Sequence, residues 1–165
     1  MKPYNHKYSK NIIEKIKYTL KNNDFVKRMM EEYKIPLEDL DTNLSFKIEY
    51  LDGKFAEGNG HEIILDPKII TEDFFEENFH FVLHELFHWI KRRVEAKFYF
   101  KDKEEVQSFV ISIVWLLLEN KSDEEINKKI FPIIDSVFKD KKFSKIIFRK
   151  MLDRAKDLII LYKNK

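Results

Sequence analysis

Apolar residues recur every three or four positions over most of the chain, which is the spacing of helices that bury one face. Polar residues, glycine and proline interrupt this pattern and divide it into separate helices. The helices so predicted cover 9–22, 25–33, about 72–94, a segment that ends near 119, a segment that begins at the capping box Ser122-Asp123-Glu124-Glu125, and 143–162. The chain is therefore expected to be mostly helical.

A period of two interrupts the helical pattern in the first half of the chain. Between Leu44 and Leu51 apolar and polar residues alternate, as in a strand with one buried face. The turn signals Asp52-Gly53 and Gly58-Asn59-Gly60 follow this stretch. We expect a small antiparallel sheet of two or three strands over about 44–66, which makes the fold α+β.

Length and composition favour one folded unit. The chain has 165 residues, of which 44% are apolar and 36% are charged, as is typical of a globular protein with its own core. We therefore expect a single domain over 1–165. It would consist of a helical N-terminal extension (1–40), a core that carries the sheet (44–119), and C-terminal helices (122–165).

Charge and sequence signals argue against several partners. The 31 basic and 29 acidic residues give a net charge of +2, which provides no footprint for nucleic acid or membrane. The N-terminus lacks the apolar core of a secretory signal, and the apolar run over 109–118 is about half of a membrane span. The basic stretch over 141–156 is typical of a solvated helix face. The sequence predicts a cytoplasmic protein.

One motif within these helices carries chemistry. His84-Glu85-Leu86-Phe87-His88 follows the pattern H-E-x-x-H inside an apolar segment, and we expect the sheet to pack on this helix. Residues four apart on a helix share a face, so His84 and His88 can bind one zinc ion, and Glu85 can act as general base. The alternative is a core helix whose histidines only pack. That alternative is costly, because two imidazoles and a carboxylate would be buried without an ion.

A catalytic zinc site needs a third protein ligand. The chain has no cysteine, so this ligand must be His, Asp or Glu. Glu105 is the preferred candidate, because the chain after His88 is long enough for a second helix to return antiparallel to the first. Glu104 is the alternative. Glu105 can also serve as the third residue of a capping box that Asp102 opens, which would compete with ligation.

The two segments together resemble the zincin metallopeptidases, and among them the gluzincin-like, ImmA/IrrE-type intracellular peptidases. Glu105-Val106-Gln107-Ser108-Phe109-Val110 loosely follows the Glu-Ala-Asn-x-Phe-Ala pattern of that group, and the resemblance covers about 44–118. It implies His84, His88 and Glu105 as zinc ligands and Glu85 as general base.

The resemblance has two departures, and it leaves two other functions open. Phe87 stands where the family has a small residue, and Val106 and Val110 stand where it has alanines, which reshapes the floor of the cleft. The function implied is zinc-dependent hydrolysis of a protein or peptide substrate. One alternative is a zincin-like pseudoenzyme, a metal-stabilised protein-interaction module. The other is a basic helical nucleic-acid-binding protein in which the motif is incidental.

Peptide hydrolysis also needs a hydrogen-bond donor for the oxyanion that forms from the scissile carbonyl. His61, His80 and Tyr99 are the candidates in the sequence. His80 precedes His84 by one helical turn on the same face. His61 opens a strand, and the resemblance to zincins implies that such an edge strand binds substrate backbone, which would bring 59–61 near the cleft. For His61 an ordinary hairpin position is the preferred interpretation, and for His80 a packing role is preferred.

Overall fold

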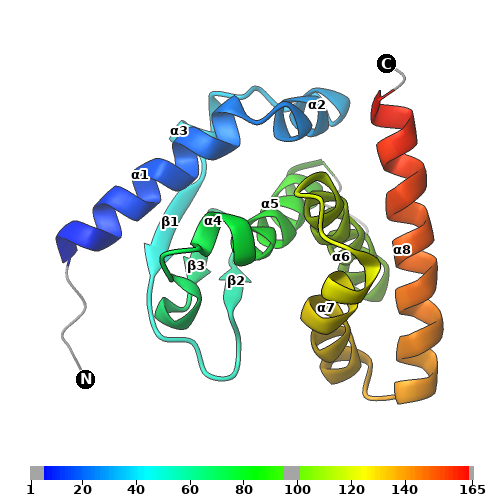
Figure 1. Cartoon of the computed structure of the whole chain (residues 1–165). Helices are drawn as coiled ribbons and strands as arrows, with labels where there is room; N and C mark the ends of the chain where they lie inside the picture. The colour runs from blue at the N-terminus through cyan, green and yellow to red at the C-terminus, as the bar shows by residue number, and fades with distance from the viewer. Residues whose placement is uncertain (1–5, 95–100, 164–165) are drawn as a thin grey trace.

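The computed structural model describes the backbone of residues 6–94 and 101–163 and the side chains of 10–94 and 104–161. Its elements are α1 (His6–Asn22), α2 (Asp24–Glu32), α3 (Asp39–Thr42), β1 (Ser45–Ile48), β2 (Ala56–Gly58), β3 (Glu62–Leu65), the 3-10 turn η1 (Pro67–Ile69), α4 (Phe74–Glu77), α5 (Phe79–Val94), α6 (Lys101–Leu118), α7 (Asp123–Phe138) and α8 (Lys141–Lys163). The fold is α+β and mostly helical, as the sequence predicts (Figure 1).

The three strands form one mixed sheet in the order β1-β3-β2. β2 pairs antiparallel with β3, with Gly58 opposite Ile63, whereas β1 pairs parallel with β3, with Phe46 opposite Ile63. The expectation of an all-antiparallel sheet is therefore wrong for β1. After β1 the chain crosses to the other side of β3 before it forms β2, so β1 and β3 run in the same direction.

The buried carboxylate of Asp66 holds this crossing in place. It accepts hydrogen bonds from the Leu51 N–H at 2.8 Å and from the Lys68 N–H at 2.8 Å. A buried carboxylate is tolerated only where such donors satisfy it. Asp66 therefore ties the loop between β1 and β2 to the turn that follows β3.

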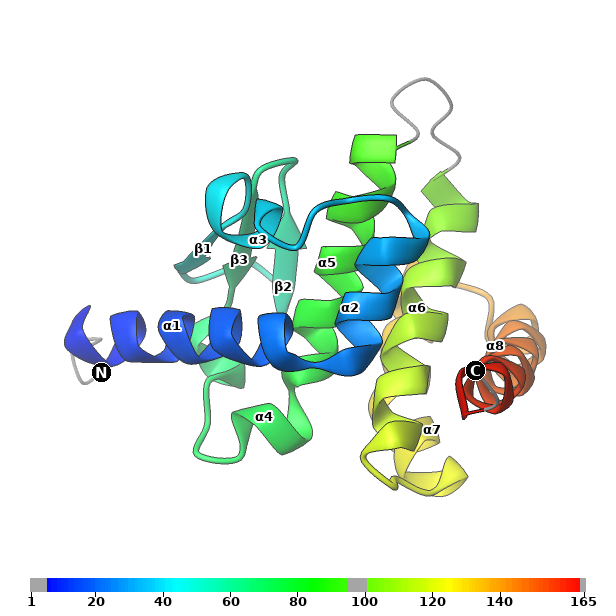
Figure 2. The same ribbon diagram turned by 90° about the horizontal axis from the view of Figure 1, so that it is seen from above.

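Helix α5 lies at the centre of the molecule, between the sheet and α6 (Figure 2). Its residues Val82, Leu83, Leu86 and Ile90 enter a core that also contains residues of α1, α2 and the sheet. Helices α6, α7 and α8 build a second apolar cluster. The sheet packs on the helix that carries the H-E-x-x-H motif, as expected. In the described part of the chain, no helix combines the length and apolarity needed to cross a membrane.

The single helix expected over 72–94 is two helices, α4 and α5, because Asn78 interrupts it. The Asn78 N–H donates to the Phe74 carbonyl at 2.9 Å, and its side-chain amide donates to the Ile69 carbonyl at 2.8 Å. The backbone of Asn78 leaves the helical region, with φ −124° and ψ −5°, so α4 ends there and α5 begins at Phe79. The capping box at Ser122 is confirmed, since Ser122 and Glu125 exchange side-chain to backbone hydrogen bonds.

An ion-pair cluster on Glu77 joins α4 to α7, and it predicts a loss of stability in acid. Hydrogen bonds from Lys129 and Lys121, with their charges, outweigh burial and lower the pKa of Glu77 to about 2. Because the folded-state pKa lies below the unfolded value, the stabilisation is present at neutral pH and lost as pH falls from about 4.5 towards 2. Lys129→Met is expected to raise the pKa of Glu77 towards its usual range, as measured by NMR titration.

Lys128→Met is the matched control for this prediction. Lys128 lies beside Lys129 but pairs with the exposed Glu124 on its own helix. The control should leave the pKa of Glu77 low. An equal pKa of Glu77 in wild-type and Lys129→Met protein would contradict the prediction.

Candidate metal centre

The two histidines of the motif lie on one face of α5. Their rings are 4.8 Å apart between centroids, and the two Nε2 atoms are separated by 3.1 Å. His88 is buried, and His84 packs against the Phe109 ring of α6 with a centroid separation of 4.7 Å. Helical periodicity and packing between α5 and α6 therefore direct both Nε2 atoms at the same point.

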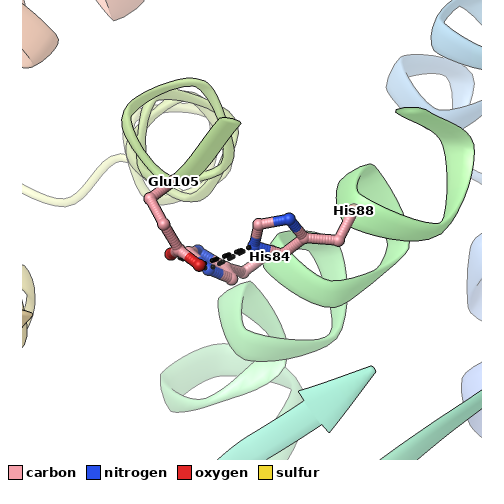
Figure 3. Close-up of side chains that lie close together, drawn as sticks. All are labelled: His84, His88 and Glu105. Carbon is pink, nitrogen blue, oxygen red and sulfur yellow. Dashed lines mark hydrogen bonds and ion pairs between the residues drawn. The ribbon is translucent and has the colours of Figure 1, made fainter. Parts of the chain in front are cut away.

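Helix α6 brings Glu105 to this point, as Figure 3 shows. One carboxylate oxygen of Glu105 lies 3.3 Å from His84 Nε2, and the other lies 3.5 Å from His88 Nε2. The potential ligand atoms of these three residues all lie within 4.8 Å of one another. The structure thus brings together the three residues that the sequence predicts as metal ligands.

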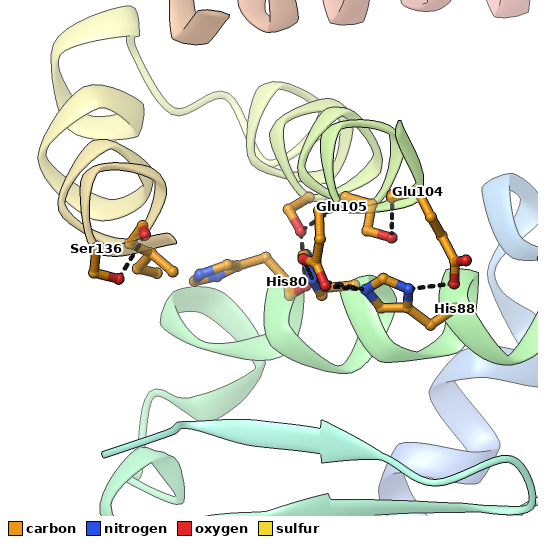
Figure 4. Close-up of polar contacts among 9 residues, drawn as sticks. His80, His88, Glu104, Glu105 and Ser136 are labelled. Atoms are coloured by element: carbon orange, nitrogen blue, oxygen red, sulfur yellow. Dashed lines mark hydrogen bonds and ion pairs between the residues drawn. The ribbon is translucent and has the colours of Figure 1, made fainter. Parts of the chain in front are cut away.

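Glu104, the alternative third ligand, lies on the other side of His88. The His88 Nδ1–H donates to the Glu104 carboxylate at 2.5 Å, away from the point shared with His84 (Figure 4). Such a bond fixes the tautomer, because a proton on Nδ1 leaves the lone pair of Nε2 directed at the cluster. Glu104 is therefore placed to orient His88 and not to join the cluster.

The competing role of Glu105 in a capping box is not what the backbone shows. Helix α6 already includes Lys101, so Asp102 lies within the helix and not at the position before it. The Glu105 carboxylate is directed to His84 and His88 on α5. The side chain of Asp102 lies outside the described side chains.

The charges of the cluster favour an anionic Glu105. Burial raises the pKa of Glu105, but hydrogen bonds from His84 and His88 and their charges outweigh it, and the pKa lies well below its usual range. Burial lowers the pKa of His88, but hydrogen bonds to Glu105 and Glu104 and the charges of Glu105 and Glu85 raise it overall. Both shifts reflect carboxylates that favour positive charge at this point, which is where a cation would bind. Two imidazole nitrogens and a carboxylate form a donor set that suits zinc.

Glu85 lies beside the cluster, against the end of β2. A Cβ atom at Gly58 would come within 2.9 Å of Glu85 Oε2, so only glycine leaves room for the carboxylate where it stands. Arg92, two turns further along α5, donates from Nη1 to the Gly58 carbonyl at 2.9 Å. The end of β2 is thus fixed against the helix that carries Glu85.

A cleft of about 890 Å³ opens over this arrangement. Its walls are formed by residues 53–58, α5, α6 and α7. The four residues that line it at the cluster are His84, Glu85, His88 and Glu105. Candidate ligands and candidate base therefore face a single concave space, as ligand and active sites commonly do.

The predicted oxyanion donors do not converge on the cluster. His61 is exposed and does not line the cleft, which agrees with the preferred interpretation of an ordinary hairpin position. The strand residues that line the cleft are Ala56–Gly58, and not 59–61 as the resemblance implies. Tyr99 lies outside the described residues.

His80 lines the cleft but is directed away from the cluster, towards α7 and Ser136 (Figure 4). Its side chain is 2% exposed, and neither ring nitrogen has a hydrogen-bond partner among the described residues. Burial first, then the charges of Lys129 and His84, lower the pKa of His80 to about 3, which keeps the ring neutral.

Sequence reasoning missed three features of the site. The role of Glu104 towards His88, the contact of Gly58 with Glu85, and the wall supplied by α7 all depend on tertiary packing. Only Gly58 left a signal, since a glycine in a strand often marks a close approach of another group.

No protein-family model, curated protein or solved structure matches this chain.

Proposed function

We propose that the chain is a zinc-dependent metallopeptidase that hydrolyses a peptide bond in a protein or peptide substrate. The observation that carries the proposal is the convergence of His84, His88 and Glu105 in a cleft, with Glu85 beside them. A structural zinc site is usually closed by four protein ligands, and it needs neither an adjacent carboxylate nor an open cleft.

Each residue of the site has a separate role in the proposed reaction. The Nε2 atoms of His84 and His88 and the carboxylate of Glu105 would hold the ion, which when bound polarises a carbonyl and makes water more acidic. Glu85 accepts the proton of the attacking water and passes it to the leaving amine. Glu104 keeps the His88 ring in one tautomer and one orientation.

Metal analysis tests the proposal. Protein purified without chelator is expected to contain about one zinc per chain, and His84→Ala or Glu105→Ala protein far less. Wild-type protein with less than roughly one-tenth equivalent of zinc, and with stability unchanged by EDTA, would show that the cluster does not bind the ion.

The second candidate function is a pseudoenzyme that uses the same metal centre to stabilise a protein-interaction surface. One observation favours it: within the described residues, none of the predicted oxyanion donors reaches the cluster, since His61 lies outside the cleft and His80 points towards α7. Hydrolysis needs such a donor and metal binding does not. Glu85→Gln separates the two functions, because it removes the candidate base and keeps the three candidate metal ligands.

Glu104→Gln is expected to weaken zinc binding about 10- to 100-fold without changing the number of ions bound at saturation. The amide can still accept a hydrogen bond from His88 Nδ1, but it removes the negative charge that makes the imidazole a better ligand. Competition with a chromophoric chelator measures the affinity. Glu119→Gln, an exposed position just after α6, is the control. Equal zinc affinities of wild-type and Glu104→Gln protein would show that Glu104 does not contribute to zinc binding.

Gly58→Ala is expected to lower peptide hydrolysis about 10²-fold while zinc content stays unchanged, because the added methyl group displaces the Glu85 carboxylate. Asn59→Ala, one residue further along, is the control and should keep full activity. Turnover of a fluorogenic peptide library and zinc content are measured on the same preparations. Full activity of Gly58→Ala would mean that the position of Glu85 against β2 is not the active one.

We also propose a cytoplasmic location, in keeping with the resemblance to intracellular peptidases. Cell fractionation with an antibody against the chain tests it.

A further inference from the structure

The outward face of the first three turns of α8 combines exposed apolar side chains with cations. Ile146 is 50% exposed and Phe143 is 46% exposed. The residues three and four positions from Ile146, which share its face of the helix, are Lys142, Phe143, Arg149 and Lys150, and all are exposed. An isoleucine is thus surrounded by three cations and a phenylalanine.

The cations of this region have no anionic partners within the described side chains. We define the basic–apolar face as Lys139, Lys141, Lys142, Phe143, Lys145, Ile146, Arg149 and Lys150. None of its six cations forms an ion pair with a described carboxylate, whereas Lys21, Lys129 and Lys156 elsewhere do.

Asp140, the acidic residue at the start of the face, is engaged in capping the helix. Asp140 accepts hydrogen bonds from the N–H groups of Lys142 and Phe143 at 2.9 and 3.0 Å, which caps α8. The next outward positions along α8 carry the acidic residues Asp153 and Asp157. The exposed cations of the second half, Arg154 and Lys156, therefore lie beside acidic residues, whereas those over 142–150 do not.

Packing of α8 does not account for the exposed apolar residues. The opposite side of the helix supplies the buried ones, among them Phe148, Met151 and Ala155, which enter the cluster shared with α6 and α7. Phe143 rests edge-on against Phe138, with ring centroids 5.5 Å apart, but Ile146 stands outside the core.

We propose that the basic–apolar face binds the surface of an anionic lipid membrane. Lysine and arginine are attracted to anionic headgroups, and apolar side chains between them enter the boundary with the acyl chains. A nucleic acid would satisfy the cations but would leave Ile146 in water. α8 would then lie on the membrane without crossing it, in keeping with its mixed composition.

The face adjoins the cleft through the end of α7. Val137, 43% exposed, lines the cleft and lies two residues before Lys139. A membrane-bound chain would therefore hold the α7 wall of the cleft beside the lipid headgroups. The inference itself does not depend on the proposed peptidase activity, because it uses none of the cluster residues.

Flotation of the full chain with vesicles tests the inference. Binding is expected with vesicles of phosphatidylcholine containing about 30% phosphatidylserine, and is expected to be lost with phosphatidylcholine alone and weakened by high salt. Lys142→Glu/Arg149→Glu is expected to lower the partition coefficient at least about tenfold. Phe143→Ser/Ile146→Ser, which leaves the charge unchanged, is expected to lower it about tenfold.

Lys10→Glu/Lys17→Glu on α1 is the matched control, since it changes the net charge by the same amount away from the face. It should bind the anionic vesicles as wild type does, and circular dichroism confirms that each variant is folded. Equal loss in the control, or equal binding to neutral vesicles, would overturn the proposal. The proposal would also be overturned if an oligonucleotide or an acidic protein displaced the vesicles and Phe143→Ser/Ile146→Ser changed neither the binding of that competitor nor the binding of the vesicles.

Discussion

Replacing Glu85 with Gln is expected to lower peptide hydrolysis about 10³-fold, because general base catalysis typically contributes between about 10² and 10⁴. Glutamine is nearly isosteric and keeps the contact with Gly58, but it cannot accept the proton of the attacking water. Zinc content should stay near that of wild type, since Glu85 is not one of the three clustered ligands. Turnover of a fluorogenic peptide library and metal analysis, on the same preparation, measure the two quantities.

The result separates the two candidate functions. Loss of turnover with retained zinc identifies Glu85 as the base of an enzyme. If zinc-loaded wild-type and Glu85→Gln protein cleave the library equally slowly, the chain is a metal-stabilised interaction module. Glu57→Gln on β2, which lines the same cleft but pairs with the exposed Lys54, is the control and should retain turnover.

The part of the site that lies within one helix could be predicted from the sequence. His84 and His88 share a face because a helix turns by about 100° per residue, and this follows from the spacing alone. The apolar residues around them identify the segment as a buried helix, which α5 is. Glu105 required a further step, since it depends on α6 returning antiparallel to α5.

Glu104 shows why adjacent residues could not be separated by sequence alone. Neighbouring positions on a helix point about 100° apart, so the rotation of α6 about its axis decides which carboxylate meets the cluster. That rotation is set by packing: Phe109 of α6 lies against His84, and the buried Ser112 donates to the His80 carbonyl at 3.2 Å. Both contacts are made between helices and leave no local pattern.

The position of the sheet in the chain could be predicted from the sequence, but the order and direction of its strands could not. Alternation of apolar and polar residues identifies β1, and glycine-rich turns identify the hairpin of β2 and β3, because both are local properties. Which edge of β3 receives β1 is set by contacts between distant parts of the chain, such as the hydrogen bond between Leu51 and Asp66, and these leave no local pattern. The same limit applies to Gly58, whose contact with Glu85 joins positions far apart in the chain.

Removal of zinc is expected to lower the melting temperature of the wild-type chain by roughly 5–10 °C. An ion that binds only the folded state stabilises it by about 2.7 kcal/mol when its free concentration is a hundred times the dissociation constant. For a chain of this size, each kcal/mol corresponds to about 2–4 °C. Differential scanning calorimetry with excess zinc and with EDTA measures the change.

His88→Ala should have the same melting temperature with excess zinc and with EDTA, because it lacks one of the three metal ligands. In the wild type this ligand lies between Glu104 and Glu105. The variant should also melt below the zinc-free wild type, since the buried Glu104 carboxylate loses its hydrogen-bond partner. His61→Ala removes an exposed imidazole and should keep the wild-type response to zinc. A zinc response that survives in His88→Ala would place the ion elsewhere. An ion held by α5 and α6 together cannot bind the unfolded chain in the same way, so its binding must stabilise the fold. If wild-type protein had the same melting temperature with zinc and with EDTA, metal binding at this cluster would not be coupled to folding.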